Sequence, residues 1–228
     1  MVSQKMVGIG FLFLGLGIAA LIPVFMAVYP SLGITQAEAG NPSVVLPVAA
    51  ANPGVFFIPG VVQVFAHAIG AVAILGLWTR IGRDSFLLSV ATLAGLAWMV
   101  IDVVDNSVAL TVVPRLAADF QAGSATAAAA FVNTTGLAEA VRLGAHFLGG
   151  LWIIGLSVFT IRSRNMPAVI GWIGVPIGLV FAGNLFVPAL LAVSFMTIPL
   201  WLIVLGVVVA RALESAPAAA LVAVPQPG

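Results

Sequence analysis

The chain alternates between long apolar stretches and short polar connections. A helix needs about 20 mainly apolar residues to cross the hydrocarbon core of a bilayer. Six stretches qualify, at residues 6–29, 55–78, 86–114, 136–160, 168–190 and 191–213. We place the last break at the Val187-Pro188 step, because proline cannot continue a helical hydrogen-bond ladder. The pattern predicts an all-α bundle of six transmembrane helices, followed by a disordered tail at residues 214–228.

The composition agrees with a membrane-embedded chain. Of 228 residues, 62% are hydrophobic and 7% are charged, whereas a soluble domain carries about a quarter charged residues. The partner that this surface needs is therefore a lipid bilayer. The net charge of +1 provides no basic field for nucleic acid. The chain has no cysteine, which excludes disulfides, thiolate catalysis and cysteine-ligated metal sites.

Basic residues indicate the orientation. Arg115 stands alone at one set of helix ends, and the other set carries Lys5, Arg80, Arg83, Arg162, Arg164 and Arg211. By the positive-inside rule the second set is cytoplasmic. We therefore predict a protein of the cytoplasmic membrane with both termini in the cytoplasm and a single domain at residues 1–213.

Two features qualify this topology. The first apolar stretch followed by Ala37-Glu38-Ala39 also resembles a signal peptide, but its apolar run exceeds the usual ~7–15 residues. Residues 30–54 and 115–135 form the predicted external connections. We expect the second of them to contain a short surface helix.

An internal repeat relates two pairs of spans. Residues 66–77 (AHAIGAVAILGL) and 145–156 (AHFLGGLWIIGL) are identical at six of twelve positions, with an offset of 79. The same offset aligns Arg83 with Arg162, and Asp105 with Asn184. The pattern favours a duplication that relates the second and third spans to the fourth and fifth as parallel repeats.

Polar residues inside the spans are the candidate site. Each ionisable side chain costs about 2.5–3.5 kcal/mol at the bilayer centre. We expect His67, Asp102 and His146 to lie near one level, close to mid-membrane. Polar side chains also join membrane helices without any further function, which is the alternative for each residue. The nine candidates are Gln63, His67, Asp102, Asp105, Asn106, Glu139, Arg142, His146 and Asn184.

The first hypothesis is a buried pocket that binds or translocates a small ligand, an ion or a proton. Carboxylates and histidines within spans are typical of proton relays. In this interpretation Asp102, Asp105 and Glu139 would be acceptors or ion ligands, and Arg142 their counter-ion or an anion anchor. The two histidines would carry protons or bind the ligand. No catalytic residue is assigned.

The second hypothesis is a b-type haem, with His67 and His146 as the iron ligands. Gly70 and Gly149 follow three residues after these histidines and would let a flat macrocycle approach the backbone. The layout is similar to six-helix ascorbate-type b cytochromes, which need a second histidine pair where this chain has Asp105 and Asn184.

Two further alternatives remain open. His67, His146 and a carboxylate would suit a zinc hydrolase, although no HExxH, GxSxG or phosphate-binding glycine loop occurs. A non-catalytic membrane subunit is the other, because the pairs Gly174 with Gly178 and Ala145 with Gly149 suit close helix packing.

The stretch 144–211 resembles a known family. It contains a glycine-rich helix, a short basic loop with Arg162, Arg164 and Pro167, a Gly-Trp-x-Gly-like helix start and a closing Trp-Leu-Ile run at residues 201–203. This pattern resembles the bacterial membrane family called domain of unknown function 4386. The resemblance implies a similar length and six-helix layout, and it brings no established activity. The segment Ile101–Asn106 (IDVVDN) is more polar than this family leads us to expect.

Overall fold

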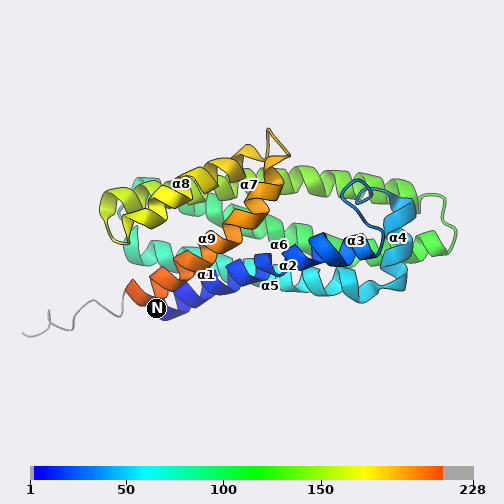
Figure 1. The fold of residues 1–228 in the computed structure, drawn as a ribbon, viewed down its shortest axis with the longest axis horizontal. Helices are drawn as coiled ribbons and strands as arrows, with labels where there is room; N and C mark the ends of the chain where they lie inside the picture. The colour runs from blue at the N-terminus through cyan, green and yellow to red at the C-terminus, as the bar shows by residue number, and fades with distance from the viewer. Residues whose placement is uncertain (1–2, 213–228) are drawn as a thin grey trace, which may run out of the picture.

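A computed structural model describes residues 3–212, whose regular secondary structure is entirely helical, with no strand in that range (Figure 1). The prediction of an all-α fold is therefore confirmed for the described residues. The predicted tail at 214–228 lies outside them. The elements are α1 Gln4–Ala19, α2 Leu21–Pro23, the π-helical turn η1 Val24–Val28, α3 Tyr29–Ser31, α4 Pro42–Ala51, α5 Pro53–Ile81, α6 Phe86–Gln121, α7 Ala127–Ser163, α8 Ala168–Gly183 and α9 Leu190–Ala212.

Five segments are long and apolar enough to cross a membrane. They are Gln4–Ser31, Pro53–Ile81, Phe86–Gln121, Ala127–Ser163 and Leu190–Arg211. The helix α8 is apolar but has 16 residues. It stops at Gly183 and does not run to residue 190 as predicted. Asn184 ends it by hydrogen bonding to Ser194 of α9, and Pro188 follows within the turn, where its ring restricts the preceding residue.

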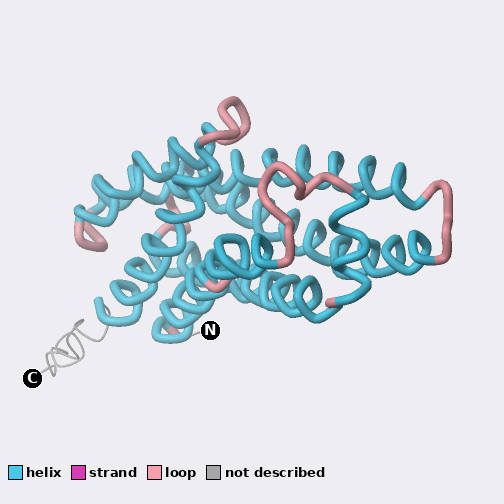
Figure 2. The backbone as a smooth tube through the Cα atoms, turned by 45° about the vertical axis from the view of Figure 1, so that its right-hand side comes forward, coloured by secondary structure: helices cyan, strands magenta, loops and turns pink. Residues whose placement is uncertain are grey.

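The long helices form a closed ring in which sequence neighbours are also neighbours in space. In this ring α1 contacts α5, α5 contacts α6, α6 contacts α7, α7 contacts α8, and α8 contacts α9. The ring closes because α9 packs along α1. Both described ends of the chain lie at one end of the bundle (Figures 1 and 2). Small residues allow the closest approaches, because a Cβ added at Gly150 would lie 2.6 Å from the carbonyl oxygen of Gly178.

The bundle has two levels along its axis. The turn between α8 and α9 lies near the middle of the long axis, whereas α6 and α7 continue to the far end, where α4 lies (Figure 1). With 36 and 37 residues, α6 and α7 are about 54 and 56 Å long at 1.5 Å per residue. The half that carries Lys5, Arg80, Arg83, Arg162 and Arg211, called the basic half, is thus a ring of α1, α5, α6, α7, α8 and α9. The far half contains α2, η1, α3 and α4 together with the continuing parts of α5, α6 and α7 (Figure 1).

The two connections that were predicted to be external differ from the prediction in their secondary structure. Pro114 does not end α6, which continues to Gln121, and α7 already begins at Ala127. The expected surface helix at 115–135 is therefore wrong, because those residues extend the two long helices. Residues 30–54 contain α4, which the sequence analysis did not predict. These parts have their own core, made of Ile34, Val45, Leu46, Ala49, Ala117 and Phe131.

The main core fills the six-helix half and is dominated by aromatic rings. Trp98 and Trp152 are 6.0 Å apart between ring centroids. Phe11 stacks on Trp152 at 5.8 Å, and Trp201 meets it edge-on at 5.9 Å. All of these side chains are buried. The centre of the ring is therefore packed with side chains.

Candidate functional site

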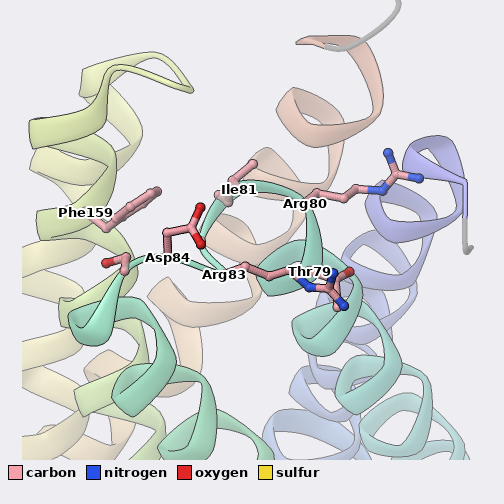
Figure 3. Close-up of a pocket in the computed structure, with 8 residues that line it drawn as sticks. Thr79, Arg80, Ile81, Arg83, Asp84 and Phe159 are labelled. Atoms are coloured by element: carbon pink, nitrogen blue, oxygen red, sulfur yellow. The ribbon is translucent and has the colours of Figure 1, made fainter.

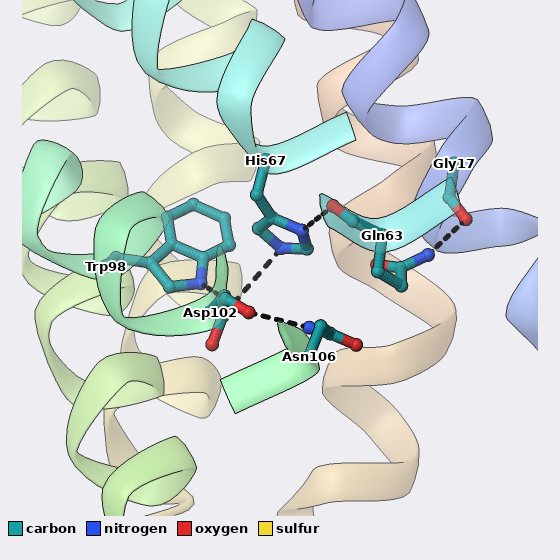
Figure 4. Close-up of polar contacts among 6 residues, drawn as sticks. All are labelled: Gly17, Gln63, His67, Trp98, Asp102 and Asn106. Carbon is teal, nitrogen blue, oxygen red and sulfur yellow. Dashed lines mark hydrogen bonds and ion pairs between the residues drawn. The ribbon is translucent and has the colours of Figure 1, made fainter. Parts of the chain in front are cut away.

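A histidine and an aspartate from neighbouring helices form the centre of the candidate site. The Nε2 atom of His67 on α5 lies 3.1 Å from Oδ2 of Asp102 on α6, and their side chains are 5% and 8% exposed (Figure 4). The indole N–H of Trp98 donates to the same carboxyl oxygen at 2.7 Å. Trp98 precedes Asp102 by one helical turn, so the α6 backbone itself sets this contact.

Three further hydrogen bonds surround the pair. The Nδ1 atom of His67 lies 2.8 Å from the backbone carbonyl oxygen of Gln63, one turn earlier. The side-chain amide of Gln63 donates to the carbonyl of Gly17 at 2.7 Å, which joins α5 to α1. The side-chain amide of Asn106 donates to the Asp102 carbonyl at 2.8 Å. The network thus spans α1, α5 and α6 (Figure 4).

The partners of His67 determine how many protons the pair holds. A carbonyl oxygen only accepts, so Nδ1 carries a hydrogen toward Gln63. The contact of Nε2 with the Asp102 carboxyl then needs one further proton, on either the ring or the carboxyl group. Without it, a nitrogen lone pair would face a carboxylate oxygen. A pair that holds this proton and has no net charge satisfies both contacts of the His67 ring.

The structure brings together four of the nine predicted residues, namely Gln63, His67, Asp102 and Asn106. Trp98 and the carbonyl of Gly17 complete the network, and the sequence analysis missed both. A signal for Trp98 was available, because it lies four residues before a buried aspartate. No sequence signal identifies a backbone carbonyl such as that of Gly17.

Three other candidates lie toward the far end of the bundle. Asp105 is half-buried, whereas Glu139 and Arg142 are exposed. Glu139 and Arg142 therefore do not lie in the buried pocket of the first hypothesis. The guanidinium of Arg142 still acts electrostatically on the carboxyl group of Asp105. The α8–α9 turn lies near the middle of the long axis, so α8 and α9 do not cover the part of α7 that continues toward the far end (Figure 1).

His146 and Asn184 have separate surroundings. The ring of His146 lies against Phe181 of α8, with 4.6 Å between centroids, and its Nδ1 atom is buried without a hydrogen-bond partner. Asn184 exchanges hydrogen bonds with the Ser194 hydroxyl and so fixes the α8–α9 turn. The repeat therefore places its two histidines in unlike environments, and the duplication stays a prediction.

The residues present do not fit a bis-histidine haem in this packing. Both ring nitrogens of His67 already have partners, at 2.8 and 3.1 Å. A Cβ at Gly149 would lie 2.5 Å from Phe181 and 2.6 Å from Trp98, so side chains occupy the surface expected to face a macrocycle. Among residues 3–212 no group of three or more His, Cys, Asp or Glu side chains is arranged to hold a metal ion.

Two surface cavities lie away from the pair. One, of about 460 Å³, is formed by residues 79–85 at the α5–α6 turn together with Phe159 (Figure 3). The other, of about 220 Å³, lies between η1 and the start of α5 and is lined by Val24, Val28, Gly54, Val55, Ile58 and Pro59. Neither cavity is lined by His67 or Asp102.

Comparison of the chain with protein-family models, with curated proteins and with solved structures finds no match. The resemblance to the domain of unknown function 4386 family therefore stays a prediction. The functional argument depends on the geometry of the site alone.

Proposed function

We propose that this chain is a six-span protein of the cytoplasmic membrane. Its His67–Asp102 pair takes up one proton from the external side and releases it to the same side. The observation that carries the proposal is the buried contact of 3.1 Å between Nε2 and Oδ2, which requires a proton between two groups that ordinarily lack one near neutral pH. Among small ligands and ions, a proton alone needs no cavity, and the pair is enclosed by packed side chains.

Burial decreases stepwise from the pair toward the far end of the bundle. His67 and Asp102 are buried, Asp105 and Asn106 are half-buried, and Arg142 is exposed. The last turn of α8 packs at the level of the pair, where Phe181 contacts Trp98 with 5.2 Å between centroids. Above that level α8 and α9 no longer cover α7. This arrangement supports proton exchange with the far side, which is external in the proposed topology.

Toward the basic end, the pair adjoins an apolar core. Phe11, Leu14, Met99 and Trp152 are each at most 1% exposed. His67 is 14 residues, or about four helical turns, before the end of α5 at Ile81. The packing therefore favours reversible binding at the pair over translocation across the membrane.

Proton release would change how α5 packs on α6. A neutral His67 with its hydrogen on Nδ1 presents a lone pair to the carboxylate of Asp102, so the contact becomes repulsive. In this proposal the proton acts as a latch between α5 and α6. Release leaves one uncompensated buried charge, which favours hydration or separation of the two helices.

The proposed topology rests on charge placement. The basic residues Lys5, Arg80, Arg83, Arg162 and Arg211 belong to the six-helix half, which the positive-inside rule assigns to the cytoplasmic side. Counting α8 as a span gives six crossings, and both described ends then share that side.

Infrared difference spectroscopy tests the proton site. The protein in lipid bilayers is titrated from pH 6 to 9, and the carboxylate bands are compared with those of Asp102→Asn and of the matched control Asp105→Asn. We expect a band change that Asp102→Asn removes and Asp105→Asn retains. An identical titration in all three proteins would refute the site and leave the pair as a helix-joining contact.

A further inference from the structure

We propose that Asp105 is the carboxylate through which the His67–Asp102 pair exchanges its proton with external water. The inference rests on the proposed function, because it concerns the route by which a proton reaches the same pair. Asp105 takes no part in the hydrogen bonds of that pair, so its role is to accept the proton from water and pass it on.

The packing of α6 on α7 places Asp105 at the level of Arg142. The two helices are antiparallel, and three close approaches set their register, namely Ala91 to Gly155, Gly95 to Trp152 and Trp98 to Gly149. Each step forward along α6 is matched by an equal step back along α7. Seven residues after Trp98 and seven residues before Gly149, the residues at the same level are Asp105 and Arg142.

Arg142 places a positive charge near the Asp105 carboxyl group without pairing with it directly. The guanidinium acts electrostatically on the carboxyl group, and an opposite charge nearby favours the ionised form of a carboxyl group. Within residues 3–212 no direct ion pair joins the two side chains, and the arginine is exposed. The carboxylate is therefore stabilised as a proton acceptor and is not held in a salt bridge.

The length of α7 puts this level at the edge of the hydrocarbon layer. Arg142 lies 20 residues before Arg162 of the basic half, a distance of about 30 Å along the helix at 1.5 Å per residue. The hydrocarbon core of a bilayer is also about 30 Å thick. With Arg162 at the cytoplasmic edge, Arg142 and Asp105 reach external water. Asp102 lies one turn deeper, which is shallower than the mid-membrane level expected from the sequence.

The side of α7 that carries Gly136 and Gly144 is open at this level. A Cβ added at either residue would meet nothing within 4 Å, so no other helix contacts that side there. The opening ends before Gly149, where an added Cβ would lie 2.5 Å from Phe181. Water beside α7 therefore reaches the level of Asp105, which is half-buried, and stops short of the packed core.

The transfer from Asp105 to the pair spans one turn of α6. Asp105 follows Asp102 by three residues, and this spacing puts both carboxyl groups on one face of the helix. The O–H bond of protonated Asp105 breaks, and the proton passes directly or through one water molecule to the Asp102 carboxylate. There it is shared with Nε2 of His67 at 3.1 Å. Asp105 returns to a carboxylate, ready for the next proton.

Two other titratable groups lie near this route. Glu139 is three residues farther out on α7 than Arg142 and is exposed, so it lies in the path of no buried transfer. His146 is four residues farther in, and its Nδ1 atom is buried without a hydrogen-bond partner. That nitrogen therefore has no hydrogen-bonded connection to the pair, and Asp105 is the better placed acceptor.

Time-resolved infrared spectroscopy after light-induced proton release tests the route. The full chain in lipid bilayers is shifted across the midpoint of its equilibrium titration, and the Asp102-dependent band is followed in the unchanged protein, Asp105→Asn and the matched control Glu139→Gln. We expect Asp105→Asn to take up the proton about a hundredfold more slowly, the lower end of what a positioned side chain contributes to proton transfer. Its equilibrium band change should be retained, added formate should restore its rate, and Glu139→Gln should not slow uptake.

Four results would overturn the proposal. An unchanged rate in Asp105→Asn would exclude this route and leave the proton site itself intact. Slowing that formate does not restore would indicate a structural effect of the substitution. Slow uptake in His146→Gln together with a normal rate in Asp105→Asn would assign the route to the histidine. Absence of the equilibrium band change in the unchanged protein would refute the proton site, and the route with it.

Discussion

The proton shared by His67 and Asp102 should make the stability of the fold depend on pH. In the native geometry the pair holds one proton more than a neutral histidine beside a carboxylate. In an unfolded chain, histidine has a pKa of about 6.5 and aspartate of about 3.9, so above pH 6.5 neither group retains that proton. The native state then binds one proton that the unfolded state lacks. Stability therefore falls as pH rises.

The magnitude follows from proton linkage. One extra proton in the native state gives a slope of about −1.4 kcal/mol per pH unit in the free energy of unfolding. The slope should hold from about pH 7 upward, until the native pair releases its proton. Few other groups titrate in this interval, because the chain contains two histidines and no cysteine.

Denaturation with sodium dodecyl sulfate in mixed micelles, followed by tryptophan fluorescence at pH 7.0, 7.5 and 8.0, measures the slope. The comparison protein is Asp102→Asn, whose neutral amide needs no shared proton and should give a slope near zero. His146→Gln in both backgrounds removes the contribution of the other histidine, whose Nδ1 atom is buried without a partner. The reasoning is refuted if the unchanged protein and Asp102→Asn have the same slope.

Three further predictions concern packing and topology. Trp98→Phe removes one hydrogen bond to the carboxyl group at 2.7 Å and should lower the free energy of unfolding by about 0.6–1.7 kcal/mol; no change in the same micelle titration would show that the indole N–H is energetically neutral. Gly150→Val places side-chain atoms against the Gly178 carbonyl and should lower the free energy of unfolding by about 1–3 kcal/mol. The midpoint of thermal unfolding should fall accordingly, and an unchanged midpoint would contradict the close approach of α7 and α8. Because the chain has no cysteine, Ser124→Cys and Asn165→Cys each introduce one exposed thiol that can be labelled. In intact cells a membrane-impermeant maleimide should label the Ser124→Cys protein alone. Labelling of the Asn165→Cys protein alone would show that the topology is the reverse of the proposed one.

The sequence predicted the helical class of the fold because helices in lipid need long apolar runs, which composition alone reveals. It failed at helix ends. Pro114 removes one hydrogen bond from α6, and the helix continues because Ala117 and its neighbours bury against α4. The end of α8 depends on the Asn184–Ser194 contact between two helices. Neither of these contacts between helices can be recognised from the residues next to it in the sequence.

The candidate site was predicted in part for a similar reason. His67 and Asp102 stand out because ionisable residues are rare in apolar helices, and the structure pairs them. Their partners depend on the relative rotation of the helices, so Arg142 became exposed and His146 packed against Phe181. A residue pattern fixes the face of one helix, whereas the pairing of faces requires the assembled bundle.

The part of α6 that continues past the six-helix half would amplify a small tilt at the His67–Asp102 pair. Asp102 lies 19 residues before the end of α6 at Gln121, a distance of about 28 Å along the axis at 1.5 Å per residue. A tilt of about 5° at the pair would therefore displace the tip of α6 by about 2.5 Å at that rise per residue. Because α4 packs on α6 and α7, this displacement would also shift the far-half core that contains Leu46, Ala117 and Phe131. Gain or loss of a single buried proton would then cause a measurable movement at the far end of the molecule.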